Sequence, residues 1–160
     1  MKTLLILRHA KSSWKDDSLP DHDRPLNKRG KQDAPLVGLR IREKGLIPEL
    51  ILSSTAKRAR ATVELVAEES NYQGEIEYSR DLYAAEAEAT IAILAELPEK
   101  YDFVMVVGHN PGLEQLLEEL TGEYQPLPTA ALAQVTMPIQ NWAELSNNRK
   151  GKLVDIWRPR

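Results

Sequence analysis

Three short apolar runs along the chain each stop at polar or charged side chains. They are residues 4–7, which precede Arg8 and His9, residues 50–52, which precede Ser53 and Ser54, and residues 103–107, which precede Gly108 and His109. Apolar runs of this length with polar boundaries are typical of strands buried on both faces of a sheet. If the three strands are parallel, the residues that follow them gather at the carboxyl edge of the sheet. Open α/β sheets bind their ligands at that edge.

Apolar residues at helical spacing occupy the segments between these runs. The spacing predicts a helix over residues 55–69, with Ser54 as its N-cap, and a second helix over residues 86–97. A third helix is predicted with Pro111 in its first turn and an end near Gly122.

A proline complicates the segment that follows the first apolar run. Asn27 is a candidate N-cap, but Pro35 fits poorly deep inside a helix. We therefore predict one helical turn over residues 28–32 and then a separate helix capped by Asp33, with Pro35 in its first turn. Gly45 is expected to stop that second helix.

Further strands are predicted over residues 75–78, 132–137 and 152–157, with a turn at residues 147–151. Strands that alternate with helices of this length are typical of α/β proteins. We expect a three-layer α/β/α sandwich with a mostly parallel central sheet. Because domains commonly hold roughly 100 to 150 residues, one domain should span residues 1–160.

The composition excludes several classes of protein. The chain has no cysteine, which excludes disulfides, thiolate metal sites and cysteine nucleophiles. Its three histidines also lack the spacing of metal ligands, so we expect no metal. No apolar run approaches the ~20 residues that span a bilayer, and the first residues do not resemble a signal peptide. We expect a soluble, cytoplasmic monomer with no membrane partner.

Charge is distributed unevenly along the chain, although the net charge is only −3. Residues 1–60 hold 14 Lys and Arg against 7 Asp and Glu, whereas residues 61–160 hold 7 against 17. The basic part favours a local positive field for an anionic substrate, although most of its lysines are equally well explained as solvated helix faces. Nucleic-acid binding is disfavoured, because the isoelectric point is near 5.7 and no aromatics are interleaved with the basic residues.

Each polar residue at the strand ends also has a structural explanation when it is considered alone. A lone histidine such as His9 is more often a hydrogen-bonded structural residue, and His109 could cap the helix that follows it. The role of Arg58 could be limited to a salt bridge with Asp or Glu. His22 lies in the polar loop of residues 12–23, where we expect an exposed side chain without a function.

The local sequence around these residues nevertheless resembles a known family. Residues 7–10 (Leu-Arg-His-Ala) resemble the Arg-His-Gly signature of the histidine phosphatase superfamily, with alanine in place of the usual glycine. Residues 53–62 are similar to its second motif, and Gly108-His109 is similar to its third. The resemblance covers residues 2–157. Within the superfamily, residues 8–12 and 24–30 look most like the SixA-type phosphohistidine phosphatase branch.

The resemblance implies a phosphoglycerate-mutase-like fold and a cofactor-independent phosphatase. His9 would be the nucleophile, and Arg8, Arg58 and His109 would form the phosphate pocket with it. Arg60 lies two positions from Arg58 and points to the other side of the helix, so the motif selects Arg58. Further substrate-binding neighbours of the pocket, implied by the same motifs, are Lys11, Ser12, Arg24, Tyr83 and Asn110.

One segment departs from the family pattern. Many members supply a carboxylic acid after the third strand, but residues 80–86 show no convincing match, and Tyr83 occupies that region. Phosphohistidine leaves as an imidazole that can already carry a proton, so it needs a general acid less. This favours phosphohistidine on a partner protein as the substrate. The alternatives are a phosphomonoesterase of small phosphometabolites, with Asp23, Asp81 or Glu86 as acid, and a phosphate-binding module without catalysis.

Overall fold

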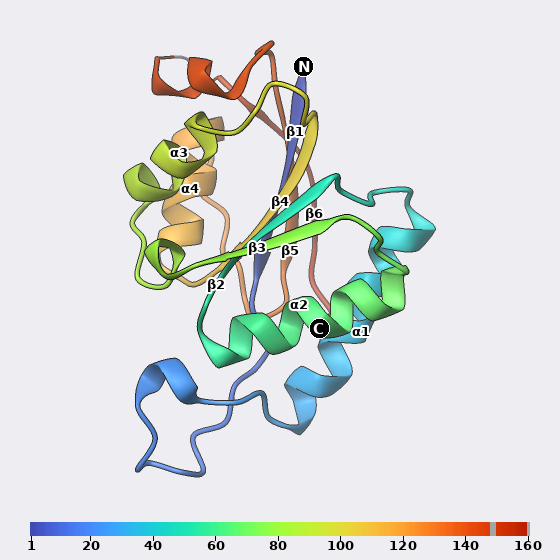
Figure 1. Ribbon diagram of the computed structural model, residues 1–160, viewed down its shortest axis with the longest axis vertical. Coiled ribbons are helices and arrows are strands. Elements are labelled where there is room, and N and C mark those ends of the chain that lie inside the picture. Colours follow the sequence, from blue (N-terminus) through green and yellow to red (C-terminus); the bar gives the residue numbers. More distant parts are fainter. Residues whose placement is uncertain (148–149, 160) are drawn as a thin grey trace.

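The computed structural model describes residues 1–147 and 150–159 and shows an α/β fold around a six-stranded sheet with the order β3-β2-β4-β1-β5-β6 (Figure 1). The strands β1 to β4 are parallel to one another, whereas β5 runs antiparallel to β1, and β6 antiparallel to β5. The predicted mostly parallel sheet is therefore confirmed. The strands are β1 (Lys2–Arg8), β2 (Leu50–Ser54), β3 (Glu75–Ser79), β4 (Phe103–Gly108), β5 (Leu132–Met137) and β6 (Lys152–Trp157).

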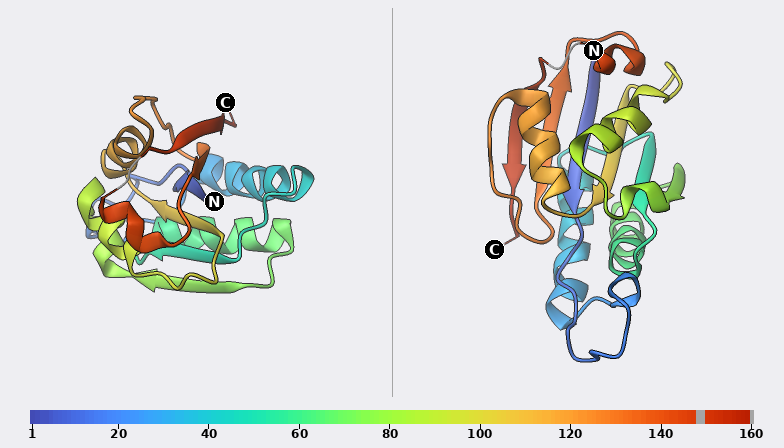
Figure 2. Two further views of the ribbon diagram at one scale, coloured as in Figure 1. Left: turned by 90° about the horizontal axis from the view of Figure 1, so that it is seen from above. Right: turned by 90° about the vertical axis from the view of Figure 1, so that its left-hand side faces the viewer.

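Helices cover both faces of the sheet and complete the three layers. The helices α3 (Ala87–Ala95) and α4 (Gly112–Thr121) lie on one face, and α1 (Lys28–Glu43) and α2 (Lys57–Ser70) lie on the other (Figure 2). Short 3-10 helices add η1 (Asp21–Asp23), η2 (Arg80–Leu82) and η3 (Trp142–Ser146). None of the helices described is long and apolar enough to cross a membrane.

The run at residues 4–7 is apolar throughout because β1 is buried on both faces. Leu4 and Ile6 belong to the core under α3 and α4, while Leu5 and Leu7 belong to the core under α1 and α2. All four side chains are fully buried. Burying each of them contributes about 1.5–3 kcal/mol. This packing fixes the position of the strand end, which carries Arg8 and His9.

The predicted break in the first helical segment is wrong. Asn27 is the N-cap, as expected, and its side chain accepts a hydrogen bond from the amide of Gly30. From there α1 runs without interruption and contains Pro35. Asp33 does not cap a second helix, because its fully buried carboxylate lies 3.5 Å from Nε of Arg29. Tertiary packing of the continuous apolar face outweighs the local cost of the proline.

The start of α2 also differs from the prediction. The helix begins at Lys57 rather than at residue 55, and the N-cap position is held by Ala56, which makes no side-chain cap. Ser54 instead ends β2, and its hydroxyl accepts a hydrogen bond from the amide of Ala56. Since Ser54 is not used as a helix cap, its side chain stays at the carboxyl edge of the sheet.

The remaining elements agree with the sequence pattern, with small differences at their ends. The helix predicted over residues 86–97 is α3. The helix α4 ends at Thr121 with Gly122 as its C-cap, close to the predicted end, but Pro111 occupies the N-cap position rather than the first turn. The loop at residues 12–23 contains the short helix η1. The turn predicted at residues 147–151 includes residues 148–149, which lie outside the described residues.

Candidate active site

The carboxyl ends of β1 and β4 lie side by side and place two histidines next to each other. Arg8 is in register with Gly108, so the residues that follow both strands emerge at the same edge of the sheet. The ring centroids of His9 and His109 are 5.0 Å apart. The amide of His9 also donates to the carbonyl of Gly108, at 3.2 Å, which ties the two strand ends together.

The ring of His9 is held in one orientation by a backbone contact. Its Nδ1 lies 2.7 Å from the carbonyl oxygen of Ala10, which can only accept a hydrogen bond. Nδ1 therefore carries the proton, and Nε2 has a free lone pair. Burial is the main reason why the pKa of His9 is lowered to about 3, with smaller contributions from His109, Arg58 and Arg8. A neutral imidazole with an unprotonated Nε2 can act as a nucleophile.

A threonine from α2 fixes the backbone around His9. The hydroxyl of Thr62 accepts a hydrogen bond from the amide of Ala10, at 3.0 Å, and donates to the carbonyl of Arg58, at 2.7 Å. Thr62 is fully buried. It lies in the second motif, at residues 53–62, but the sequence alone did not reveal this bridge between the end of β1 and α2.

The second histidine is oriented by a buried serine. Nε2 of His109 lies 2.8 Å from the hydroxyl of Ser54, which already accepts a hydrogen bond from the amide of Ala56. The hydroxyl proton of Ser54 can therefore be donated to Nε2, which leaves the proton of His109 on Nδ1. Nδ1 is buried and has no partner in the described part of the chain. It can donate a hydrogen bond to a bound anion. Burial, helped by Arg58, lowers the pKa of His109 to about 4.

Two arginines bring positive charge to the histidine pair. Arg8 donates from one terminal nitrogen to the carbonyl of Leu127, at 3.2 Å, while Arg58 donates to the carbonyl and the carboxylate of Asp21, at 2.7 and 3.0 Å. The Nε atoms of both arginines are buried without a hydrogen-bond partner among the described residues. Arg60, in contrast, stacks over the ring of Tyr78, with 4.2 Å to its centroid. The motif thus selected the arginine that faces the site.

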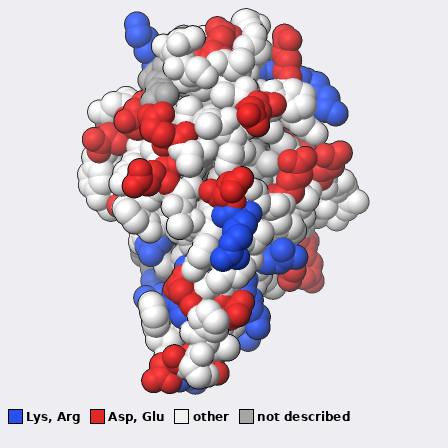
Figure 3. Space-filling model, turned by 60° about the vertical axis from the view of Figure 1, so that its left-hand side comes forward, with Lys and Arg blue, Asp and Glu red and all other residues white. Residues whose placement is uncertain are grey.

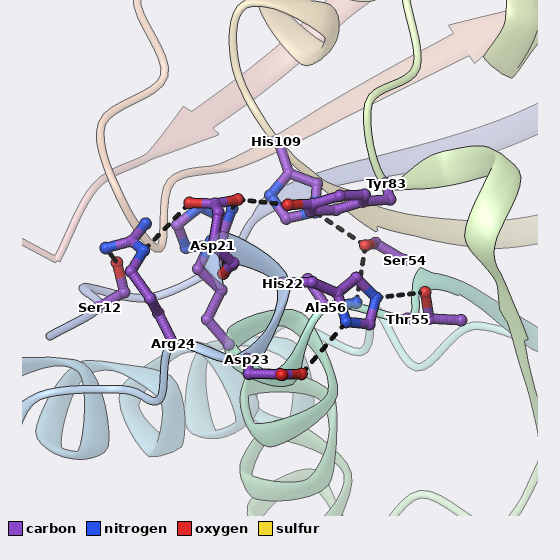
Figure 4. Close-up of polar contacts among 12 residues, drawn as sticks. Ser12, Asp21, His22, Asp23, Arg24, Ser54, Thr55, Ala56, Tyr83 and His109 are labelled. Carbon is purple, nitrogen blue, oxygen red and sulfur yellow. Dashed lines mark hydrogen bonds and ion pairs between the residues drawn. The ribbon is translucent and has the colours of Figure 1, made fainter. Parts of the chain in front are cut away.

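Asp21 is a site carboxylate that the sequence analysis missed. In Figure 4 it lies between Arg24 and Tyr83, and its carboxylate contacts Arg24 at 3.1 Å and Arg58 at 3.0 Å, and accepts from the hydroxyl of Tyr83. The hydrogen bond from Tyr83 is the largest of the effects that lower its pKa, followed by those from Arg58 and Arg24. Asp21 is therefore ionised. The spacing of three residues between Asp21 and Arg24, which form an ion pair, could have indicated this one contact, but not those with Arg58 and Tyr83.

The other residues predicted near the pocket differ in how they are placed. Ser12 is buried and accepts a hydrogen bond from Arg24 at 2.9 Å, whereas Lys11 is exposed at the cavity wall. The side-chain amide of Asn110 donates to Glu114 and to the carbonyl of Leu127. Its side chain thus fixes the local backbone, while its Oδ1 has no partner among the residues described.

The expectation that the side chain of His22 is exposed is wrong, because it is largely buried. Its Nε2 lies 2.8 Å from the hydroxyl of Thr55, and its ring packs edge-on against Tyr83 at 4.7 Å (Figure 4). Only 25% of the side chain is exposed. Tyr83 packs in turn against His109, with 5.6 Å between ring centroids. A long loop carries no periodicity from which such burial could be predicted.

A cavity of about 260 Å³ opens over these side chains. Its walls include the predicted group Arg8, His9, Arg58 and His109. An adjoining cavity of about 410 Å³ shares Asp21 with it and is bounded on its other side by Tyr83 and Glu86. Of the three candidate acids, Glu86 alone reaches either cavity, since Asp81 is exposed elsewhere and Asp23 lies 3.6 Å from His22. The described residues contain no cluster of three potential metal ligands.

Comparisons with known proteins agree with this arrangement. A model of the histidine phosphatase superfamily (branch 1) matches residues 4–86. An uncharacterised chloroplast protein of Arabidopsis thaliana is 35% identical over 152 residues, which cover 89% of this chain and 70% of that protein. A candidate phosphohistidine phosphatase SixA from Agrobacterium tumefaciens matches with a TM-score of 0.85 and 30% identity, over 99% of this chain and 98% of that one. The structure of the protein histidine phosphatase SixA complexed with tungstate matches with a TM-score of 0.84 and 27% identity, over 98% of this chain and 97% of that one.

This chain belongs to the histidine phosphatase superfamily, and the two structures just described, to which it is 27–30% identical, are SixA proteins. The sandwich of Figure 1 is the phosphoglycerate-mutase-like fold of those SixA structures. The family and the fold predicted from the three motifs are both confirmed. The matched range ends at residue 86, so His109 enters the site through the geometry described above rather than through that match.

Proposed function

We propose that this chain is a phosphatase that removes phosphate from phosphohistidine through a covalent intermediate on His9. The observation that carries the proposal is the buried, neutral imidazole of His9, with its Nε2 free, in a cavity shared with Arg8, Arg58 and His109. Phosphoryl transfer needs a nucleophile and positive charge around the equatorial oxygens. The site supplies both from its own side chains, so no metal or other cofactor is part of the mechanism.

The reaction proceeds in two displacements. Nε2 of His9 attacks phosphorus as the bond between phosphorus and the substrate nitrogen breaks, and the departing imidazole keeps or takes up a proton. Water then attacks the phosphorylated His9, which releases inorganic phosphate and restores the free imidazole. Arg8 and Arg58 bind the phosphoryl oxygens through charged hydrogen bonds, and His109 donates from Nδ1. The cationic groups also favour the neutral form of His9 in the resting enzyme.

The preference for a nitrogen leaving group follows from the state of Asp21. Asp21 is the carboxylate in direct contact with Arg58, and its charge is fixed by hydrogen bonds from Tyr83, Arg58 and Arg24. An ionised carboxylate cannot protonate an alkoxide. A phosphohistidine substrate avoids this need, because imidazole leaves in a protonated form. The named activity of the SixA structure complexed with tungstate, a protein histidine phosphatase, supports the same substrate class.

The partner in this proposal is a phosphohistidine-bearing protein, which reaches a cavity on the surface of a monomeric chain. Lys11, Ser12, Arg24, Tyr83 and Asn110 form or support the cavity walls and are proposed to contact the substrate around the phosphoryl group. Action as one domain in the cytoplasm belongs to the same proposal.

One observation favours a second candidate, a phosphomonoesterase of small phosphometabolites. Glu86 borders the adjoining cavity, where it could protonate an alkoxide leaving group. Steady-state turnover of a phosphohistidine peptide and of a set of sugar phosphates separates the candidates. We expect the peptide to be the better substrate, and Glu86→Gln to leave its turnover unchanged. Preferential turnover of a sugar phosphate that is lost in Glu86→Gln would establish the second candidate instead.

A further inference from the structure

Trp14 is the most exposed large apolar side chain of the part of the chain that the structure describes, at 72%. It belongs to neither apolar core, so packing of the fold does not account for it. It stands instead at the wall of the cavity that contains His9, whose own exposure is 6%. The cavity therefore has a nucleophile at its base and an open indole ring at its rim.

The indole ring is held in place by the site itself. The guanidinium of Arg24 lies 3.5 Å from the centroid of the ring and covers one of its faces. Arg24 is 7% exposed and is fixed by hydrogen bonds to Ser12, to the carbonyl of Ser13 and to Asp21. A ring stacked on an immobile cation loses little freedom when a ligand covers its other face. Trp14 is thus a preorganised binding surface rather than a mobile side chain.

The position of the ring suits a leaving group. In an in-line displacement the leaving group departs on the side of phosphorus opposite the nucleophile. Because His9 lies at the base of the cavity, that side faces the rim, where Trp14 is exposed. An imidazole is planar, and it is cationic once it is protonated. The face of an indole attracts planar rings and cations, whereas it offers much less to an aliphatic alcohol.

We propose that Trp14 is a specificity-determining residue that binds the imidazole of the phosphohistidine substrate on its open face. The inference rests on the proposed function and deepens it. Arg8, His9, Arg58 and His109 act on the phosphoryl group, which every phosphorylated substrate shares. Trp14 acts on the departing ring and distinguishes phosphohistidine from substrates without a ring.

The kinetic test compares a phosphohistidine peptide with phosphoramidate, whose leaving group is ammonia. Stacking on an aromatic side chain contributes about 1–3 kcal/mol. We expect Trp14→Ala to lower kcat/KM for the peptide by about tenfold, mainly through KM, and to change that for phosphoramidate by less than about twofold. Trp14→Phe keeps a stacking face and should recover most of the activity. Ile47→Ala removes another exposed apolar side chain, just before β2 at the opposite end of the sheet, and should change neither substrate.

Two kinetic outcomes would overturn the inference. Equal losses on both substrates would show that Trp14 acts by holding Arg24, and unchanged kinetics on both would show that the ring is not used.

A binding measurement distinguishes failure of the inference about Trp14 from failure of the proposed function. In His9→Ala, titration with a phosphohistidine peptide that lacks tryptophan should change the tryptophan fluorescence, and the added substitution Trp14→Phe should remove that change. Binding that depends on Trp14 without any turnover by the wild type would reject the proposed function alone. Binding without any effect of Trp14 would reject the inference.

Discussion

The hydroxyl of Ser54 lies 2.8 Å from Nε2 of His109 and, by donating to it, leaves the ring proton on Nδ1. We expect Ser54→Ala to reduce kcat by about tenfold. Without the hydroxyl, the tautomer of His109 is no longer fixed, so the ring no longer reliably donates from Nδ1 to the phosphoryl group. Ser53→Ala is the matched control, since Ser53 is equally buried in β2 but bonds only to the backbone carbonyl of Ser54. Both substitutions should lower the free energy of unfolding by about 1–3 kcal/mol, but only Ser54→Ala should lower the activity. Equal kcat values for the two variants, measured on a phosphohistidine peptide, would contradict this role.

Asp21 contacts Arg58, so we expect it to compete with a bound anion for that guanidinium. Replacing it with asparagine removes a negative charge 3.0 Å from the guanidinium while keeping the shape of the side chain. We expect Asp21→Asn to tighten inhibition by orthophosphate or tungstate by about fivefold. The free energy that corresponds to this factor is a small fraction of the attraction between two charges at this separation. Asp23→Asn is the control, because Asp23 lies beside His22. Weaker inhibition in Asp21→Asn would mean that the carboxylate mainly positions Arg58.

Thr62 joins the strand that precedes His9 to the helix that carries Arg58. Thr62→Val removes the hydroxyl that bonds the amide of Ala10 and the carbonyl of Arg58. We expect a loss of about 1–3 kcal/mol in urea unfolding and a lower kcat, since the end of β1 and helix α2 lose a shared contact. Thr62→Ser retains the hydroxyl and should restore kcat. An active Thr62→Val enzyme would show that the backbone around His9 holds its position without this bridge.

The two site histidines make stability depend on pH. Their pKa values in the folded protein, about 3 for His9 and about 4 for His109, lie below the ordinary value near 6.5. Between those values the unfolded chain binds more protons, so the free energy of unfolding falls as the pH decreases below about 6.5. The slope should approach about 1.4 kcal/mol per pH unit for each histidine. Urea unfolding from pH 7 to pH 5 measures it, and His9→Asn should reduce the slope. A slope unchanged in that variant would contradict the buried, neutral state of His9.

The sheet and the meeting of the two histidines at its edge could be predicted because burial and motif point to the same strands. Residues 4–7 are apolar on both faces since cores lie on both sides of β1, so the run reveals a central strand. The residues that end β1 and β4 must then meet, and His9 and His109 do. The boundaries of α1 and α2 could not be predicted, because the packing of whole helix faces outweighs the local preferences of Pro35 and Ser54.

The loop that completes the site is where prediction from the sequence failed. Asp21 and His22 lie in a polar segment, and the contacts that bring them to the site are with distant residues, namely Arg58, Tyr83 and Thr55. No local periodicity encodes such contacts. The uneven charge along the sequence also predicted less about the surface than about the site. On the face in Figure 3 basic and acidic side chains are interspersed, so the basic half of the sequence forms no continuous positive surface there.

The central claim is that His9 carries the phosphoryl group during turnover. Mixing the protein with a labelled phosphohistidine peptide, quenching in alkali and mapping the label by mass spectrometry tests it most directly, with His9→Ala as the matched variant. We expect phosphate on His9 in the wild type, together with turnover, and neither in His9→Ala. Equal turnover in both proteins with no adduct on His9 would contradict the mechanism and leave a phosphate-binding module as the better account.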